Sequence, residues 1–237
     1  MKIINSICQS IFRPACLVYI FLCTAAFGVS IWSNAIFTAN PEPNFVNLPI
    51  AKTLLTVQSC FMILIYPAIL FLRKEKMIDA EKKWSQKLLA NLIEILGFYI
   101  ISLPLYYVAQ FYSSTSVDQL FRGVLATLFC IPVSLSIACA LDAKKIRPIV
   151  LATMIFFSGA NYYAAFFLSD FLRGLDFSWL IELSPVSFTW IATGEVLPNF
   201  WLRYLGEIIG WLILSALFVC FGTLLAHKKT NSNTVSA

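Results

Sequence analysis

Charged side chains are scarce in this chain: of its 237 residues, 12% are charged and 59% are hydrophobic. In soluble domains roughly a quarter of the residues are charged. This imbalance excludes an ordinary soluble domain and predicts a membrane protein. Histidine occurs once, at His227. Because catalytic and metal sites rely on histidines, paired acids or ligand clusters, we expect neither an enzyme nor a metal site.

Several motifs are missing as well. The sequence has no GxxxxGK[ST] phosphate-binding loop, and no serine stands in a nucleophile motif with a base partner. The seven cysteines fall in the N-terminal segment or within the apolar runs, and none lies in an expected outer loop, so no disulfide framework is implied. We therefore expect no cofactor. The net charge of +5 follows from membrane topology and gives no reason to expect nucleic-acid binding.

Long apolar runs dominate the rest of the sequence. Each is close to the ~20 residues that a helix needs to cross a ~30 Å hydrocarbon layer. Only one of them carries a charge, Glu94. We expect an all-α polytopic membrane protein with six transmembrane helices: Pro14–Asn40, Thr53–Leu72, Leu88–Tyr112, Gly123–Leu141, Pro148–Ser169 and Ile208–Ala226.

Lysine and arginine gather in alternate connections between these runs. With the N-terminus inside, the inner segments hold 13 of the 17 positive residues, and the outer segments hold 4: Lys52, Arg122, Arg173 and Arg203. Cytoplasmic loops retain positive charge, so the N-terminus and C-terminus are both predicted to be cytoplasmic. Cleavage of a signal peptide near Ala25 would leave five spans and spoil this charge pattern.

The two ends of the chain differ in character. The first residues place four isoleucines at helical spacing, which predicts an N-terminal interfacial helix before Pro14; the alternative is that the first span begins early. A single transmembrane domain is expected over residues 1–229, followed by a disordered cytoplasmic tail over 230–237.

The longest inner connection, Arg73–Lys87, is rich in charge and in good helix formers and lacks proline and glycine. It is either a solvated loop that follows the positive-inside rule or a helix offered to a soluble partner. Within the third span, Glu94 is a functional candidate because a buried charge in a membrane is costly. Its structural alternatives are pairing with an inner lysine or snorkelling to the interface.

The segment 170–203 is too apolar for an ordinary loop and too interrupted to cross a membrane. Its apolar pieces of about seven to ten residues fit short helices that dip into the outer half of the bilayer and return. Ser184 suits an N-cap with Pro185 at the first helical position. We expect a re-entrant helical pair between the fifth and sixth spans; the alternative is a loop resting on the interface through its aromatic rings.

These parts, with the stretch "LSPVSFTWIATG" at Leu183–Gly194, resemble the permease subunits of ABC-2-type exporters, with serine where that family commonly has asparagine before the proline. The resemblance implies an ABC-type ATPase partner, a homodimer or a second permease, and a bacterial inner membrane. It assigns ATPase coupling to Glu75, Met77, Asp79, Glu81 and Trp84. It assigns an outer gate to Trp179, Pro185, Phe188 and Trp190.

A membrane scaffold, an assembly factor or a small facilitator without an ATPase is the competing interpretation. In that case the basic inner loop would bind a different partner.

Overall fold

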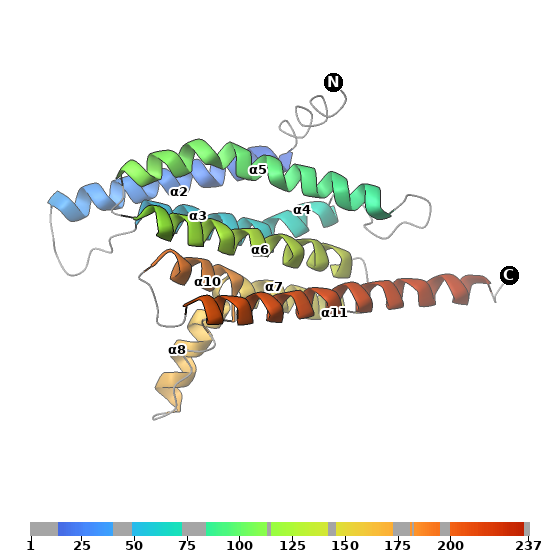
Figure 1. Cartoon of the computed structure of the whole chain (residues 1–237). Coiled ribbons are helices and arrows are strands. Elements are labelled where there is room, and N and C mark those ends of the chain that lie inside the picture. The colour runs from blue at the N-terminus through green and yellow to red at the C-terminus, as the bar shows by residue number, and fades with distance from the viewer. Residues whose placement is uncertain are drawn as a thin grey trace, which may run out of the picture.

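The computed structural model describes residues 14–39, 49–72, 84–112, 115–141, 146–172, 181, 183–194 and 200–234. Within these residues all regular structure is helical, as the sequence predicts. The proposed interfacial helix before Pro14 and most of the inner loop 73–87 lie outside the described residues. The helices form an elongated bundle (Figure 1).

Four helices are long and apolar enough to cross a membrane, which confirms the first four predicted spans as helices. Three of them are α2 (Pro14–Ala39), α5 (Trp84–Tyr112) and α6 (Val117–Leu141). The fourth is a continuous helix made of α3 (Ile50–Cys60), η1 (Phe61–Ile65) and α4 (Tyr66–Leu72). The segment η1 is one π-helical turn, in which the hydrogen-bond ladder contains an extra residue.

The predicted fifth span is not a single straight helix. It consists of α7 (Arg147–Ile155), the π-helical segment η2 (Phe156–Ala160) and α8 (Asn161–Phe171), and its two halves are bent by 81°. The cause is local: Gly159 has φ +145°, a conformation that interrupts a right-handed helix and that glycine adopts without steric cost. Figure 1 shows α8 leaving the bundle sideways.

Two further helices complete the described structure. The short α10 (Pro185–Ala192) lies in the predicted re-entrant segment, and α11 (Phe200–Thr234) follows it. The apolar part of α11 with described side chains is Tyr204–Cys220. The helix continues beyond Lys229, where the sequence predicts a disordered tail. Once a helix exists, adding a residue costs little, so a long apolar helix can extend into a polar end.

Helix α6 is the central element of the bundle. It contacts α3, α4, α5, α7, α10 and α11, and every residue from Val133 to Leu141 is buried. The helices α2 and α5 pack on one side of the α3–α4 helix, and α7, α10 and α11 lie on the other side (Figure 1). Large apolar side chains on the outer faces of α2, α5 and α11 are exposed, as lipid-facing surfaces require.

Four fully buried aromatic side chains, Tyr19, Phe61, Tyr66 and Phe98, join α2, α5 and the α3–α4 helix. Phe98 stands at the centre, with ring centroids 5.0 Å from Tyr19, 5.3 Å from Phe61 and 5.5 Å from Tyr66. The Tyr19 hydroxyl also forms a hydrogen bond with the Ser102 hydroxyl of α5. Close packing of this kind stabilises helix pairs in lipid, where the hydrophobic effect between helices is small.

We predict that Phe98→Ala destabilises the protein by ~3–5 kcal/mol, because it leaves a cavity that three aromatic rings surround. Ile100→Ala is the control: Ile100 lies on the same helix but is 60% exposed, so its effect is expected within about 0.5 kcal/mol. Thermal unfolding in detergent, followed by intrinsic fluorescence, measures both. Equal shifts for the two variants would contradict this role of the cluster.

Candidate functional site

The short helix α10 is the candidate site, because it contacts η2, α3 and α6. It begins as the sequence predicts. Ser184 is the N-cap, its side-chain oxygen accepts the N–H groups of Val186 (3.2 Å) and Ser187 (3.4 Å), and Pro185 occupies the first helical position. The helix buries five of its residues: Pro185, Val186, Phe188, Thr189 and Ala192.

At its N-terminal end, α10 contacts the break in the α7–α8 helix. The Ser184 hydroxyl donates a hydrogen bond to the Phe157 carbonyl of η2. The buried Asn161 amide donates to the Ile181 carbonyl (3.0 Å) and to the Ser187 hydroxyl (3.3 Å). The Cys60 thiol of α3 lies 3.7 Å from the Ser158 carbonyl, next to the Phe157 carbonyl in the same segment. Side chains therefore bind backbone groups around the break, as helix interruptions within a membrane require.

The two short helices α7 and α10 run in the same direction, and their combined length is close to that of one membrane crossing. Arg147 at the start of α7 donates a hydrogen bond from Nε to the Leu141 carbonyl at the end of α6 (3.1 Å), whereas the end of α10 contacts the start of α6. Both short helices therefore run antiparallel to α6. The break at Gly159 comes ~18 Å along the helix from Arg147, and α10 adds about 12 Å, which together match a ~30 Å hydrocarbon layer.

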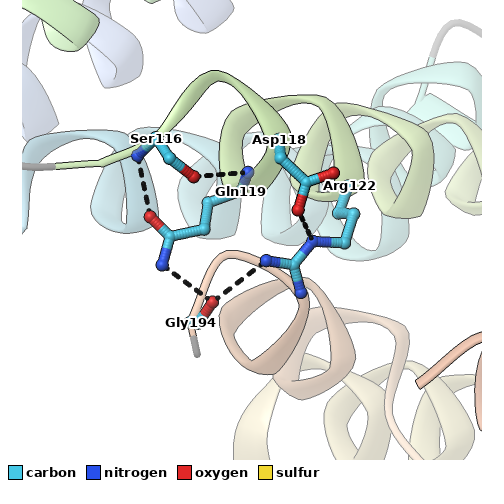
Figure 2. Close-up of polar contacts among 5 residues, drawn as sticks. All are labelled: Ser116, Asp118, Gln119, Arg122 and Gly194. Carbon is cyan, nitrogen blue, oxygen red and sulfur yellow. Dashed lines mark hydrogen bonds and ion pairs between the residues drawn. The ribbon is translucent and has the colours of Figure 1, made fainter. Parts of the chain in front are cut away.

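At its C-terminal end, α10 is bound by the start of α6 (Figure 2). The Gly194 carbonyl accepts hydrogen bonds from Gln119 Nε2 (3.1 Å) and Arg122 Nη2 (3.4 Å). Arg122 is only 2% exposed, and its Nε forms an ion pair with Asp118 at 3.0 Å. A buried arginine requires such an anionic partner and hydrogen-bond acceptors.

A capping box at the start of α6 orients Gln119. The Ser116 N–H donates to Gln119 Oε1 (2.8 Å), and the Gln119 N–H donates to Ser116 Oγ (3.2 Å). Each residue thus satisfies a backbone N–H of the other. The carbonyl half of the Gln119 amide caps α6, which directs its NH₂ half to the Gly194 carbonyl of α10 (Figure 2).

A second cation approaches the same end of α10 from α3. Lys52 Nζ lies 5.2 Å from the centre of the Trp190 ring, within the range of a cation–π interaction. With Arg122 it places two positive charges beside the C-terminal end of a helix, where the helix dipole is negative. These two cations and the Gln119 amide therefore favour the docked position of α10.

The middle of α10 makes polar, aromatic and close backbone contacts. Ser59 Oγ of α3 and Thr189 Oγ1 form a buried hydrogen bond of 2.8 Å. The Phe188 ring packs against α11, with centroids 5.6 Å from Tyr204 and 5.5 Å from Trp211. Gly123 of α6 lies so close that an added Cβ would be 2.1 Å from Thr193 Cγ2.

The structure brings three of the predicted gate residues together: Pro185 and Phe188 are buried on α10, and Trp190 is 36% exposed. Trp179 lies outside the described residues. So do the predicted coupling residues Glu75, Met77, Asp79 and Glu81. Trp84 begins α5, but its side chain is not among those described. The roles in gating and coupling remain predictions.

Glu94 is 2% exposed in α5, and Tyr66 donates a hydrogen bond to its Oε2 at 3.3 Å. Such burial is inconsistent with a side chain that snorkels to the interface. Tyr66 also belongs to the aromatic cluster, so the Glu94 carboxylate is tied to the packing between α4 and α5. Glu94 lies outside the α10 site.

Sequence reasoning missed Lys52, Gln119, Arg122 and Asn161 as members of the site. Lys52 and Arg122 were recognisable as two of the four positive charges outside the predicted inner segments. The Ser116–Gln119 spacing also matches a capping box. What they bind could not be inferred, because Gly194 lies 72 residues from Arg122 in the sequence.

Among the described residues, no group of three or more His, Cys, Asp or Glu side chains is arranged to hold a metal ion. The contacts around α10 hold this helix against η2, α3 and α6. Comparison with known proteins finds no matching family model, no similar curated protein and no similar solved structure.

We predict that Gly123→Ala destabilises the protein by ~1–3 kcal/mol, because the new methyl group would overlap Thr193 Cγ2 and lie 2.6 Å from Leu55 Cδ1. Gly97→Ala is the matched control, since a Cβ there has no neighbour within 4 Å. The apparent melting temperature in detergent should fall for the first variant only. A comparable fall for both would show that α6 and α10 do not approach as closely as described.

Proposed function

We propose that this protein is the membrane-spanning permease subunit of an ATP-driven exporter of the ABC-2 type. Its pathway is formed by a homodimer or with a second permease, and ATP is hydrolysed by a separate ATPase subunit. The observation that carries the proposal is the packing of α10 against a broken helix, with a hydrogen bond between a side chain and a backbone carbonyl at each end of α10. Broken helices of this kind are a recurrent feature of transport proteins.

The proposed topology has six crossings. In it α7, completed by α8 or α10, supplies the fifth crossing, and α11 supplies the sixth. The excess of lysine and arginine in alternate segments supports cytoplasmic termini in a bacterial inner membrane. Lys52, Arg122 and the end of α10 then lie at the outer surface, and Arg147 at the inner surface. Trp179, Pro185, Phe188 and Trp190 form the outer gate.

The inner loop before α5 is proposed to receive the ATPase. Met77 and Trp84 provide apolar anchors, and Glu75, Asp79 and Glu81 provide polar contacts. Closure of the ATPase pair would move this loop and α5 with it. Glu94 is a candidate for transmitting that movement, because its carboxylate accepts a hydrogen bond from Tyr66 on α4.

The first experiment is mild detergent extraction of the tagged protein from its native host, followed by identification of the copurifying chains. We expect a soluble ATPase with a phosphate-binding loop in stoichiometric amount. Recovery of the chain without an ATPase, under conditions that preserve a known transporter complex from the same cells, would favour a scaffold or facilitator instead.

With the ATPase identified, we predict that Trp84→Ala weakens its association about tenfold, as expected for removal of an aromatic anchor at an interface. Permease-stimulated ATP hydrolysis should fall accordingly. Trp32→Ala is the matched control, because Trp32 is 67% exposed on α2, a candidate span. If both variants keep the parent affinity and stimulation, Trp84 has no part in coupling.

A further inference from the structure

The bent helix Arg147–Phe171 has the length of a complete membrane span. Straightened, it would extend ~37 Å, more than the ~30 Å of the hydrocarbon layer. In the structure its second half turns by 81° at Gly159 and leaves the bundle (Figure 1). On α8 the side chains of Tyr163, Phe167 and Phe171 are between 73% and 81% exposed.

The bend and the docking of α10 share one atom, the carbonyl oxygen of Phe157. It accepts a hydrogen bond from the Ser184 hydroxyl, while the Asn161 N–H is shared between the Gly159 carbonyl and the Phe156 carbonyl, one residue further back than in an α-helix. In a regular α-helix the Asn161 N–H would bond to Phe157 instead. Straightening the helix therefore offers the Phe157 carbonyl a different donor and removes the need for Ser184.

The position of Asp170 favours a straight helix. Asp170 is exposed near the end of α8. With Arg147 at the inner surface, as in the proposed topology, the bend lies ~18 Å into the membrane. Because α8 is nearly perpendicular to α7, the Asp170 carboxylate then stays at a depth where charge is costly. In a straight helix Asp170 lies ~35 Å from Arg147, beyond the hydrocarbon layer. The contacts of α10 thus favour the bend, and the depth of Asp170 in the membrane opposes it.

We propose that Phe156–Asn161 is a two-state hinge that couples α8 to α10. In one state the helix is bent, and Ser184 binds the Phe157 carbonyl. In the other the helix is straight, the Asn161 backbone N–H binds that carbonyl, Ser184 loses its contact with η2, and the end of α8 reaches the aqueous phase. The hinge depends on insertion in a membrane and does not depend on an ATPase partner.

The test measures the rate at which a thiol introduced near the end of α8 reacts with a membrane-impermeant maleimide. Ser169→Cys is introduced into a chain that keeps the fully buried Cys130 and has Cys60 replaced by serine, so that a donor to the Ser158 carbonyl remains. The other cysteines are replaced by alanine. The protein is placed in vesicles opened to the reagent on both faces, so that the result does not depend on orientation. Peptide mass spectrometry distinguishes the introduced thiol from Cys130.

Gly159→Ala should raise the labelling rate of the introduced thiol about tenfold, because alanine is disfavoured at positive φ and favoured in a straight helix. Ser184→Ala should raise it as well, since it removes the competing donor. The controls are Gly97→Ala, with free space around the new methyl group, and Thr153→Ala, whose hydroxyl bonds only within its own helix at 2.9 Å. Cys130 should stay unlabelled throughout.

Rates within twofold of the matched control for both variants would overturn the hinge. If Gly159→Ala also exposes Cys130, the comparison of Ser184→Ala with Thr153→Ala decides, and equal rates in that pair overturn the proposal. Because no ATPase enters the experiment, its outcome is separate from the copurification result.

Discussion

A backbone carbonyl or N–H group within a membrane must find a hydrogen-bond partner in the protein, and the break at Gly159 makes this requirement acute. In the described structure, Cys60 of α3 and Ser184 before α10 bind the Ser158 and Phe157 carbonyls next to the break, and Asn161 of α8 binds the Ile181 carbonyl. Without them, bending the helix would expose polar groups at a cost of several kcal/mol each. The position of α10 follows from this constraint.

The other end of α10 is fixed by charge and amide groups from a different part of the chain. Arg122 and Gln119 meet the Gly194 carbonyl, and Lys52 covers the Trp190 ring. The central helix α6 can make these contacts because Gly123 allows α10 to approach without a side chain in between. Gly123 and Arg122 are adjacent in the sequence, and both contribute to the contact between α6 and α10.

Much of the fold could be predicted from the sequence, because hydropathy and length determine which segments form membrane helices. The start of α10 could also be predicted, since Ser184 and Pro185 carry a local signal. The bend could not be predicted, because Gly159 lies in an apolar run similar in length to the straight spans. The side chains that bind the carbonyls just before it, Ser184 and Cys60, lie elsewhere in the chain. The partners of Arg122 and Lys52 were hidden for the same reason. All the proposed gating and coupling roles stay predictions from the family resemblance.

The π-helical segment η1 lies between a contact with α10 and a contact with α5. Before it, Ser59 of α3 faces Thr189 on α10; after it, Tyr66 of α4 faces Glu94 on α5. Each residue of a helix advances the facing direction by about 100°, so the extra residue in the η1 ladder sets the angle between these two contacts. Removing one residue from η1 would rotate everything after it by about that amount, and the helix could keep its contact with α10 or its contact with Glu94, but not both.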